Sequence, residues 1–139
     1  MDIRRPKQIF NFIICTDILK DITNKYSIIG TYTNDIVVGE FPARLRLALY
    51  ADFLADDTPN HKVDFRLTID NEEPLFIKGE LRDSTRGQIT ALAVNNLEAL
   101  IPKPGEIKVE VQIDSGKWVT ITRKKVLLGT VAELSTPPS

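Results

Sequence analysis

The residue best suited to proton transfer near neutral pH is the single histidine, His61. It ends the polar segment 56–61 between two predicted strands, so we expect a solvated loop residue. A hydrolase with a Ser–His–Asp or Cys–His arrangement would have to use this one imidazole, and the sequence has no Gly-x-Ser-x-Gly turn to expose a nucleophile. We therefore predict that the protein is not an enzyme and has no catalytic residues.

The only cysteine, Cys15, cannot form an internal disulfide. It lies in line with Ile13 and Leu19 on a predicted strand, which favours a small buried hydrophobic side chain over a reactive thiol. One histidine and one cysteine, far apart in the sequence, do not supply a set of ligands for structural zinc. We predict no metal site and no cofactor.

Acidic residues form two groups in predicted loops. The first group is Asp52, Asp56 and Asp57, and the second is Asp70, Glu72 and Glu73. The groups lie at opposite ends of one predicted strand, which argues against a shared site. Calcium binds six to eight oxygen atoms, so the first group together with Asp83 and Ser84 is a candidate calcium site. We favour the simpler interpretation that these are solvated turn residues.

Basic and aromatic side chains are the remaining candidates for recognition. The basic residues are Arg4, Arg5, Lys7, Arg44, Arg46 and the run 123–125, and the aromatic candidates are Trp118 and Tyr32. For the run 123–125 we favour protection of a sheet edge, because charged side chains discourage association between strands. For the aromatic residues we favour packing over the stacking of a base or a sugar.

The overall composition narrows the class of protein. The 139 residues include 42% hydrophobic and 27% charged side chains, which is typical of one globular domain. A net charge of −1 argues against nucleic-acid binding. The sequence has no apolar stretch long enough to span a membrane, and its N-terminus lacks the apolar core of a signal peptide. We expect a soluble, cytoplasmic protein with no membrane partner.

Apolar and polar residues alternate through most of the chain, which is the pattern of half-buried β-strands. The clearest strands are 62–70, 107–113 and 118–125, and others are predicted over 10–20, 26–33, 44–50, 75–81 and 89–94. Turn residues predict hairpins over 10–33, 62–81 and 107–125. Residues 95–100 are the one segment where a short helix competes with a strand.

Seven or eight short strands without alternating helices predict an all-β fold. We expect a two-layer antiparallel β-sandwich of the immunoglobulin-like kind, with a partly closed β-barrel as the alternative. The sequence has no repeat or interior linker, so residues 1–139 are predicted to form a single domain. The polar ends, residues 1–7 and 135–139, are expected to be mobile.

Four segments carry a resemblance to a known group of proteins. They are residues 12–17, 26–32, Phe41-Pro42 and 126–129. Together they resemble a family of uncharacterised small bacterial proteins, and the similarity spans nearly the whole chain. The resemblance implies a short β-sandwich domain of bacterial origin without assigned catalytic residues. Gly30 also has a physical interpretation, since a glycine in a strand permits the close approach of a neighbouring group or marks a bulge.

The predicted fold and the lack of catalytic groups favour a non-catalytic protein-interaction or assembly module, with a protein partner or self-association. The alternative is a domain that binds calcium or another small ligand through its acidic loops. An unpaired sheet edge or a large apolar patch would favour the first, and a concave pocket with convergent polar groups the second. An enzyme would require Asp17, Asp35 or His61 to share a pocket.

Overall fold

The computed structural model describes residues 6–23 and 25–129. This part of the chain forms ten β-strands and no helix, which confirms the predicted all-β class. The strands are β1 (Ile9–Lys20), β2 (Tyr26–Thr31), β3 (Ile36–Val38), β4 (Ala43–Leu54), β5 (His61–Ile69), β6 (Leu75–Ile77), β7 (Glu80–Leu81), β8 (Ile89–Ile101), β9 (Gly105–Ile113) and β10 (Val119–Leu128). Within the described ranges, the chain has no helix that could cross a membrane.

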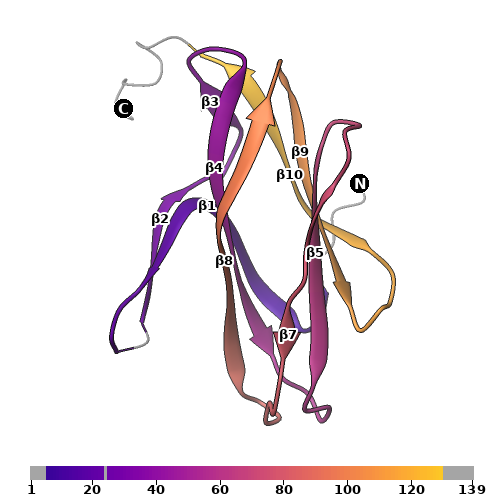
Figure 1. Cartoon of the computed structure of the whole chain (residues 1–139). Coiled ribbons are helices and arrows are strands. Elements are labelled where there is room, and N and C mark those ends of the chain that lie inside the picture. The colour runs from indigo at the N-terminus through magenta and orange to yellow at the C-terminus, as the bar shows by residue number, and fades with distance from the viewer. Residues whose placement is uncertain (1–5, 24, 130–139) are drawn as a thin grey trace.

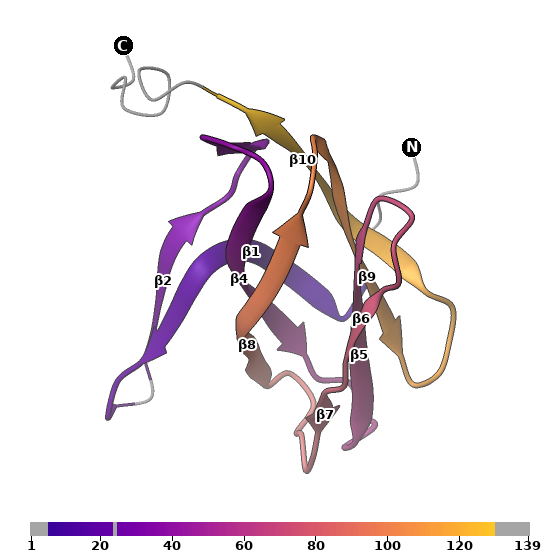
Figure 2. The same cartoon turned by 45° about the horizontal axis from the view of Figure 1, so that its top comes forward.

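The strands form two sheets, which Figures 1 and 2 show from two directions. One sheet has the order β2-β1-β4-β8, and the other has the order β3-β10-β9-β5-β6, with the short β7 paired to β5. Among the strands described, every pair is antiparallel except β3 with β10, which is parallel. Neither sheet closes on itself, so the barrel alternative was wrong.

Residues from both sheets form one hydrophobic core. Leu47 and Phe53 of β4 enter it from one sheet, and Val63 of β5 and Val109 of β9 enter it from the other, and all four are fully buried. These residues occupy alternate positions of their strands, as expected when one face of each strand is turned inward. The alternation read from the sequence therefore identifies the face of each strand that meets the core.

Two of the predicted hairpins have the expected partners. In the first, Phe65 pairs with Ile77 and Lys62 with Glu80, so β6 and β7 follow one continuous register against β5. In the second, β9 and β10 pair across the turn at residues 114–118. A short connection leaves two strands little choice of partner, which is why these pairings were predictable.

Gly79 lies where the ladder between β6 and β7 is interrupted. A Cβ atom at this position would lie 2.6 Å from the backbone carbonyl oxygen of Val63. We expect Gly79→Ala to lower the free energy of unfolding by about 1 to 2 kcal/mol, because the hairpin backbone must move apart to admit a methyl group. Urea unfolding followed by circular dichroism measures the change. The exposed neighbour Lys78 is the control, and equal stability of Gly79→Ala and Lys78→Ala would contradict the prediction.

The predicted first hairpin is present as β1 and β2. Gly30 has a φ of 70°, and a Cβ atom there would lie 2.6 Å from Oγ1 of Thr16, so the close approach predicted for this glycine is confirmed. β1 pairs with β4 only as far as Cys15 and Ala48. The remainder of the hairpin therefore projects from the sheet, as Figure 1 shows at its lower left.

Strand number and the segment 95–100 differ from expectation. The short strand β3 was not predicted, and residues 95–100 continue β8 as a strand, so the helix alternative was wrong. Ala99 and Ile101 are buried in the core, in the alternation of a strand. The pairing of β8 with β4 shifts register in this segment, and Asn96 has a φ of 59°, which together mark a β-bulge. The sequence pattern alone did not distinguish this bulge from a helical turn.

The chain ends are only partly described. Residues 1–5 and 135–139, which make up most of the predicted mobile ends, lie outside the described residues. Pro6 is described, and its carbonyl oxygen accepts a hydrogen bond from the amide of Ile9 at 3.0 Å. Core residues extend from Ile9 to Val126, so both ends of the described chain contribute to the same core.

Candidate interaction surface

β8 is the outermost strand of the four-stranded sheet, and among the described strands it pairs with β4 alone. It has 13 residues, whereas the other outermost strands, β2, β3 and β6, have six, three and three. The outer side of such a strand presents a row of backbone amide and carbonyl groups to which another extended chain can bind. β8 is thus the longest sheet edge in the described structure.

The first half of β8 lacks the sequence features that usually protect a sheet edge from pairing with another strand. Residues 89–94 read Ile-Thr-Ala-Leu-Ala-Val and contain no charged residue, proline or glycine. Natural edges are commonly protected by charged side chains, prolines or bulges. In β8 the bulge at Asn96 and the one charged residue, Glu98, both lie in the second half. Residues 89–94 therefore remain open to strand pairing.

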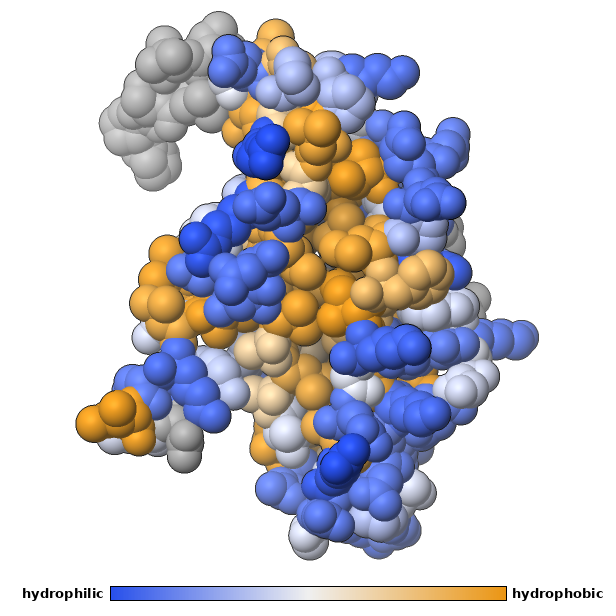
Figure 3. Space-filling model, viewed as in Figure 1, coloured by the Kyte–Doolittle hydropathy of each residue, from blue (hydrophilic) through white to orange (hydrophobic). Residues whose placement is uncertain are grey.

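Apolar side chains are exposed beside this edge. On β8, Ile89 is 55% exposed and Leu100 is 59% exposed, and both lie on the outward face of the sheet. Phe76 on β6 is 56% exposed and lies on the outward face of the other sheet, so these side chains border the edge and do not lie between the sheets. Figure 3 shows apolar surface along β8 and between β8 and the β5–β6 hairpin, bordered by hydrophilic residues. We call the surface formed by β8 and β6 the open flank. An apolar surface with a polar border is typical of protein–protein contacts.

The two faces of β8 differ in a way that suits an added strand. Leu92 and Val94 pack against the core but remain partly exposed, so an added strand could cover them further. Ala91 and Ala93 face outward, and Ala93 is exposed. These small outward side chains leave the backbone of residues 89–94 accessible from the side.

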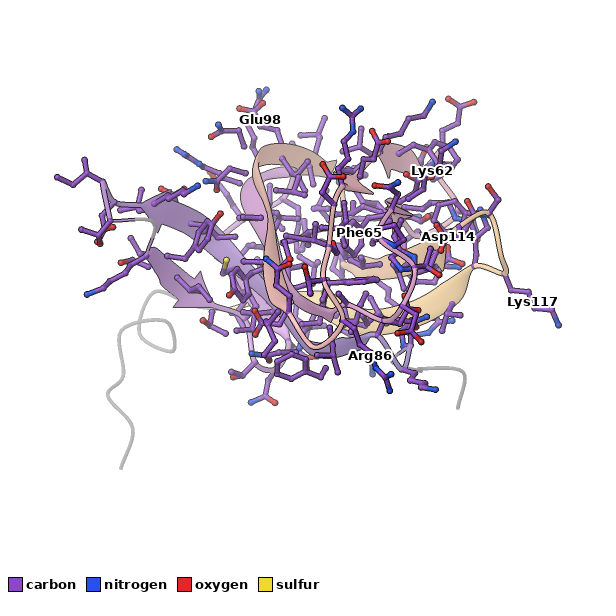
Figure 4. The ribbon with its side chains drawn as sticks, turned by 90° about the horizontal axis from the view of Figure 1, so that it is seen from below. Lys62, Phe65, Arg86, Glu98, Asp114 and Lys117 are labelled. Atoms are coloured by element: carbon purple, nitrogen blue, oxygen red, sulfur yellow. The ribbon has the colours of Figure 1, made fainter. Side chains whose placement is uncertain are left out.

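The structure corrects the prediction for His61, which is buried and only 4% exposed. It begins β5, and its ring centroid lies 5.1 Å from that of Phe53. Its Nδ1 lies 2.5 Å from Oδ2 of Asp114 in the β9–β10 turn, and its Nε2 lies 2.9 Å from Oδ1 of Asp56 in the β4–β5 loop. We call His61, Asp56 and Asp114 the His61 cluster. Figure 4, which views the molecule from below, shows Asp114 close to Lys62 at this end.

The three members of the His61 cluster shift one another's pKa. Burial alone would lower the pKa of His61, but the hydrogen bonds to Asp114 and Asp56 outweigh burial and raise it. The pKa of Asp56 is lowered by the hydrogen bond from His61 and by the amide of Thr58. For Asp114, burial opposes the shift, but the amide of Lys62 and the imidazole together lower the pKa. Both ring nitrogens of His61 thus face carboxylates, an arrangement that favours the protonated imidazole.

The geometry of the His61 cluster favours a structural role. A general base needs a ring nitrogen with an available lone pair, whereas both nitrogens of His61 face carboxylates and the raised pKa favours the protonated ring. The two carboxylates lie at opposite nitrogens, so they do not converge on one position for a metal ion. The imidazolium instead ties the β4–β5 loop to the β9–β10 turn.

The candidate calcium residues are not brought together. Asp52 lies in β4 rather than in a loop, and its Oδ1 accepts a hydrogen bond from the hydroxyl of Tyr50 at 2.8 Å. Asp57 lies 3.6 Å from Arg86, and residues 83–84 lie in the β7–β8 loop. Over residues 6–23 and 25–129, no group of three or more His, Cys, Asp or Glu side chains could hold a metal ion. The calcium site stays a prediction without support from the geometry.

The second acidic group divides into two roles. Glu72 and Glu73 are exposed in the β5–β6 turn, which agrees with the interpretation as solvated turn residues. Asp70 has a structural role, because its Oδ1 accepts a hydrogen bond from the amide of Glu106 at 2.9 Å. Its carboxylate occupies the space where a side chain on Gly105 would lie. Asp70 thus orders the start of β9.

A hollow of about 440 Å3 lies beside the His61 cluster, with Lys7, Asp56, Asp57 and Arg86 in its lining. Its volume falls in the range of small-molecule sites. However, three of its charged groups already have partners within the protein, since Asp57 lies 3.6 Å from Arg86 and Asp56 is bound to His61. The hollow is therefore a weaker candidate site than the edge of β8.

The predicted basic residues do not form one patch. Arg44 and Arg46 lie on β4, whereas residues 123–125 lie on β10, in the other sheet. Arg44 lies 3.7 Å from Glu98, and Arg46 lies 3.6 Å from Asp17. Residues 123–125 precede the part of β10 that pairs with β3, so their position agrees with edge protection.

The aromatic candidates take part in packing. Tyr32 packs against the core, as predicted. Trp118 packs against two side chains of the six-stranded sheet: its ring centroid lies 4.4 Å from Cζ of Arg66 and 6.1 Å from the ring centroid of Phe76. Residues 4–5, the remaining basic candidates, lie outside the described part of the chain.

The other residues considered for chemistry lie apart. Cys15 is buried with Ile18 in a small cluster on the outward face of the four-stranded sheet, as predicted, and burial raises the pKa of its thiol. Asp17 lies on β1 beside Arg46, whereas Asp35 is exposed just before β3. Neither carboxylate is among the hydrogen-bond partners of the His61 imidazole, which are Asp56 and Asp114.

A bidentate ion pair between Arg66 and Glu110 was missed by the sequence analysis. Nε and Nη2 of Arg66 donate to the two carboxylate oxygens of Glu110 at 2.9 and 2.7 Å. Glu110 is only 7% exposed, and the hydrogen bonds from Arg66 lower the pKa of its carboxyl group. The sequence signal for this ion pair was that Arg66 and Glu110 occupy polar positions of alternating strands. That signal does not reveal that β5 pairs with β9.

Comparison with known proteins identifies a family. Residues 11–123, from β1 into β10, match a family model described as "Family of unknown function (DUF6941)". No curated protein matches the sequence. The match supports the resemblance to an uncharacterised family.

Proposed function

The chain belongs to the DUF6941 family, and we propose that it is a non-catalytic protein-interaction module that binds an extended chain at the edge of β8. One observation carries the proposal. β8 is a long outermost strand whose residues 89–94 have no charge, proline or glycine. Such an edge favours pairing with another strand.

Strand addition is the mode of binding. A strand placed beside β8 would extend the four-stranded sheet, and backbone hydrogen bonds to residues 89–94 would supply much of the affinity. Its inward side chains would cover Leu92 and Val94, which are partly exposed. Its outward side chains would lie beside Ala91 and Ala93, so selectivity would come from small, apolar neighbours.

The proposal includes several finer expectations. The two sheets are proposed to form an immunoglobulin-like sandwich, because strands of alternating apolar and polar residues enclose a core to which both sheets contribute. A bacterial and cytoplasmic protein is proposed from the resemblance and from the single buried cysteine. Binding of calcium or another small ligand is the second candidate, and the hollow beside the His61 cluster supports it.

Photo-crosslinking tests the proposal. A photoreactive amino acid in place of Ala93, irradiated in an extract of the native cells, is expected to give a covalent adduct with the bound chain. The matched control places the same amino acid at Ser27, which is exposed on β2 at the opposite edge of the sheet. Adding Ala91→Lys should abolish the Ala93 adduct, because a lysine on an edge blocks strand addition. An adduct that survives Ala91→Lys, or that forms equally at Ser27, would contradict the proposal.

A further inference from the structure

We infer that the chain bound at β8 is the β8 of a second copy of this protein, paired antiparallel about a twofold axis. The inference rests on the proposed function, because it identifies the partner of the same edge. In this arrangement, residues 89–94 of the two copies lie side by side. The two four-stranded sheets then become one continuous sheet, and the open flanks of both copies meet.

The charge pattern of β8 suits pairing with itself. A twofold axis brings each residue close to the same region of its copy, so a charged strand would meet its own charge. Residues 89–94 have no charge to repel, and Glu98 lies beyond the bulge, 3.7 Å from Arg44. The same segment offers no complementary charge to an acidic or basic peptide. The strand that matches it is therefore an uncharged, aliphatic one, which is what β8 itself provides.

Pairing of β8 with itself would also limit the assembly to two copies. It uses the same edge on both copies, so the contact is closed. Pairing of β8 with β2, the other edge of the sheet, would be head to tail and would continue without limit. β2 is the poorer partner, because it has six residues and Gly30 near its end has a φ of 70°.

The contact between the two copies is small. Six extended residues span about 20 Å, and the flank of two packed sheets with their side chains is roughly 20 Å deep. The resulting area, about 400 Å2 per copy, is about half of each partner's share in a standard interface. The dimer therefore belongs among transient complexes, and it should dissociate on dilution.

Sedimentation velocity of the full chain over about a thousand-fold range of concentration tests the inference. The average mass should rise from the monomer value toward the dimer value. Ala93→Lys should keep the protein monomeric at concentrations where at least half of the wild type is dimeric. Ser27→Lys, an equally exposed change on the other edge, should behave as the wild type. If circular dichroism shows that Ala93→Lys is unfolded, Ala91→Lys replaces it, since Asp52 lies opposite that position.

Two kinds of outcome would overturn the inference. If the wild type stays monomeric over the whole concentration range, the chain bound at β8 is not a second copy. The proposed function would still stand if the photoreactive residue at position 93 formed an adduct with a different protein. Species larger than a dimer, or loss of association in Ser27→Lys, would exclude the twofold arrangement in favour of head-to-tail pairing. Absence of both the dimer and any Ala93 adduct would overturn the inference and the proposed function together.

Discussion

Replacing Arg66 with alanine is expected to lower the free energy of unfolding by about 3 kcal/mol. The substitution leaves the carboxylate of Glu110, 7% exposed, without its two hydrogen bonds from the guanidinium. Lys108 lies 3.6 Å from Glu110 and compensates only in part. The stacking of Arg66 on Trp118 is lost as well. Urea unfolding at neutral pH, followed by circular dichroism, measures the change.

Arg82 provides the matched control for Arg66. It also forms an ion pair, 2.9 Å from Glu80, but both of these side chains are largely exposed. Exposed pairs contribute little, so Arg82→Ala should leave the free energy of unfolding nearly unchanged. Combining Arg66→Ala with Glu110→Leu should restore part of the loss, because the unpaired buried charge is removed. Equal effects of Arg66→Ala and Arg82→Ala would show that burial of Glu110 has no energetic importance.

The protein is expected to lose stability as the pH rises through the pKa of His61 in the folded state. Folding raises this pKa, so the protonated imidazole stabilises the folded state. This contribution to stability is fully present below the pKa of His61 in the unfolded state, about 6.5, and is lost as the pH rises through its pKa in the folded state. Folding lowers the pKa of Asp56 and Asp114. Their contribution is therefore present above an unfolded value of about 3.9 and is lost as the pH falls through their folded values. Urea unfolding across this pH range should give a maximum between the two windows.

Replacement of His61 identifies the origin of the pH dependence. His61→Ala should lower the free energy of unfolding by about 2 kcal/mol at pH 6, because it opens a cavity beside Phe53 and leaves Asp56 and Asp114 facing each other. Both carboxylates are about half exposed, so water limits the loss. The difference between wild type and His61→Ala should shrink as the pH rises. A difference that is constant from pH 6 to pH 9 would show that the imidazolium is not the stabilising form.

Local patterns predicted individual strands because alternation and turns involve residues close together in the sequence. The hairpins at 62–81 and 107–125 are present with the expected partners, since a short turn leaves few other pairings. Cys15 is buried as predicted, but it lies in a separate cluster with Ile18 and Ala48, and Leu19, with which the sequence aligned it, is exposed. The burial of His61 was predictable by the same rule, because it is in phase with Val63 and Phe65, but its polar neighbours masked the signal.

Contacts between strands that are distant in the sequence were decided only by the tertiary structure. The pairs β4–β8 and β5–β9 depend on how whole sheets pack, and the second of them joins Arg66 to Glu110. The same holds for the bulge at Asn96 and for the turn that brings Asp114 to His61.

The sequence by itself determined an all-β chain whose strands bury one face, because side-chain alternation depends only on neighbouring residues. Which strand lies at an edge was decided by the packing of both sheets. Residues 89–94 would be an ordinary central strand if a further strand covered them. They form a candidate binding site because, in the described structure, β8 has β4 on one side only.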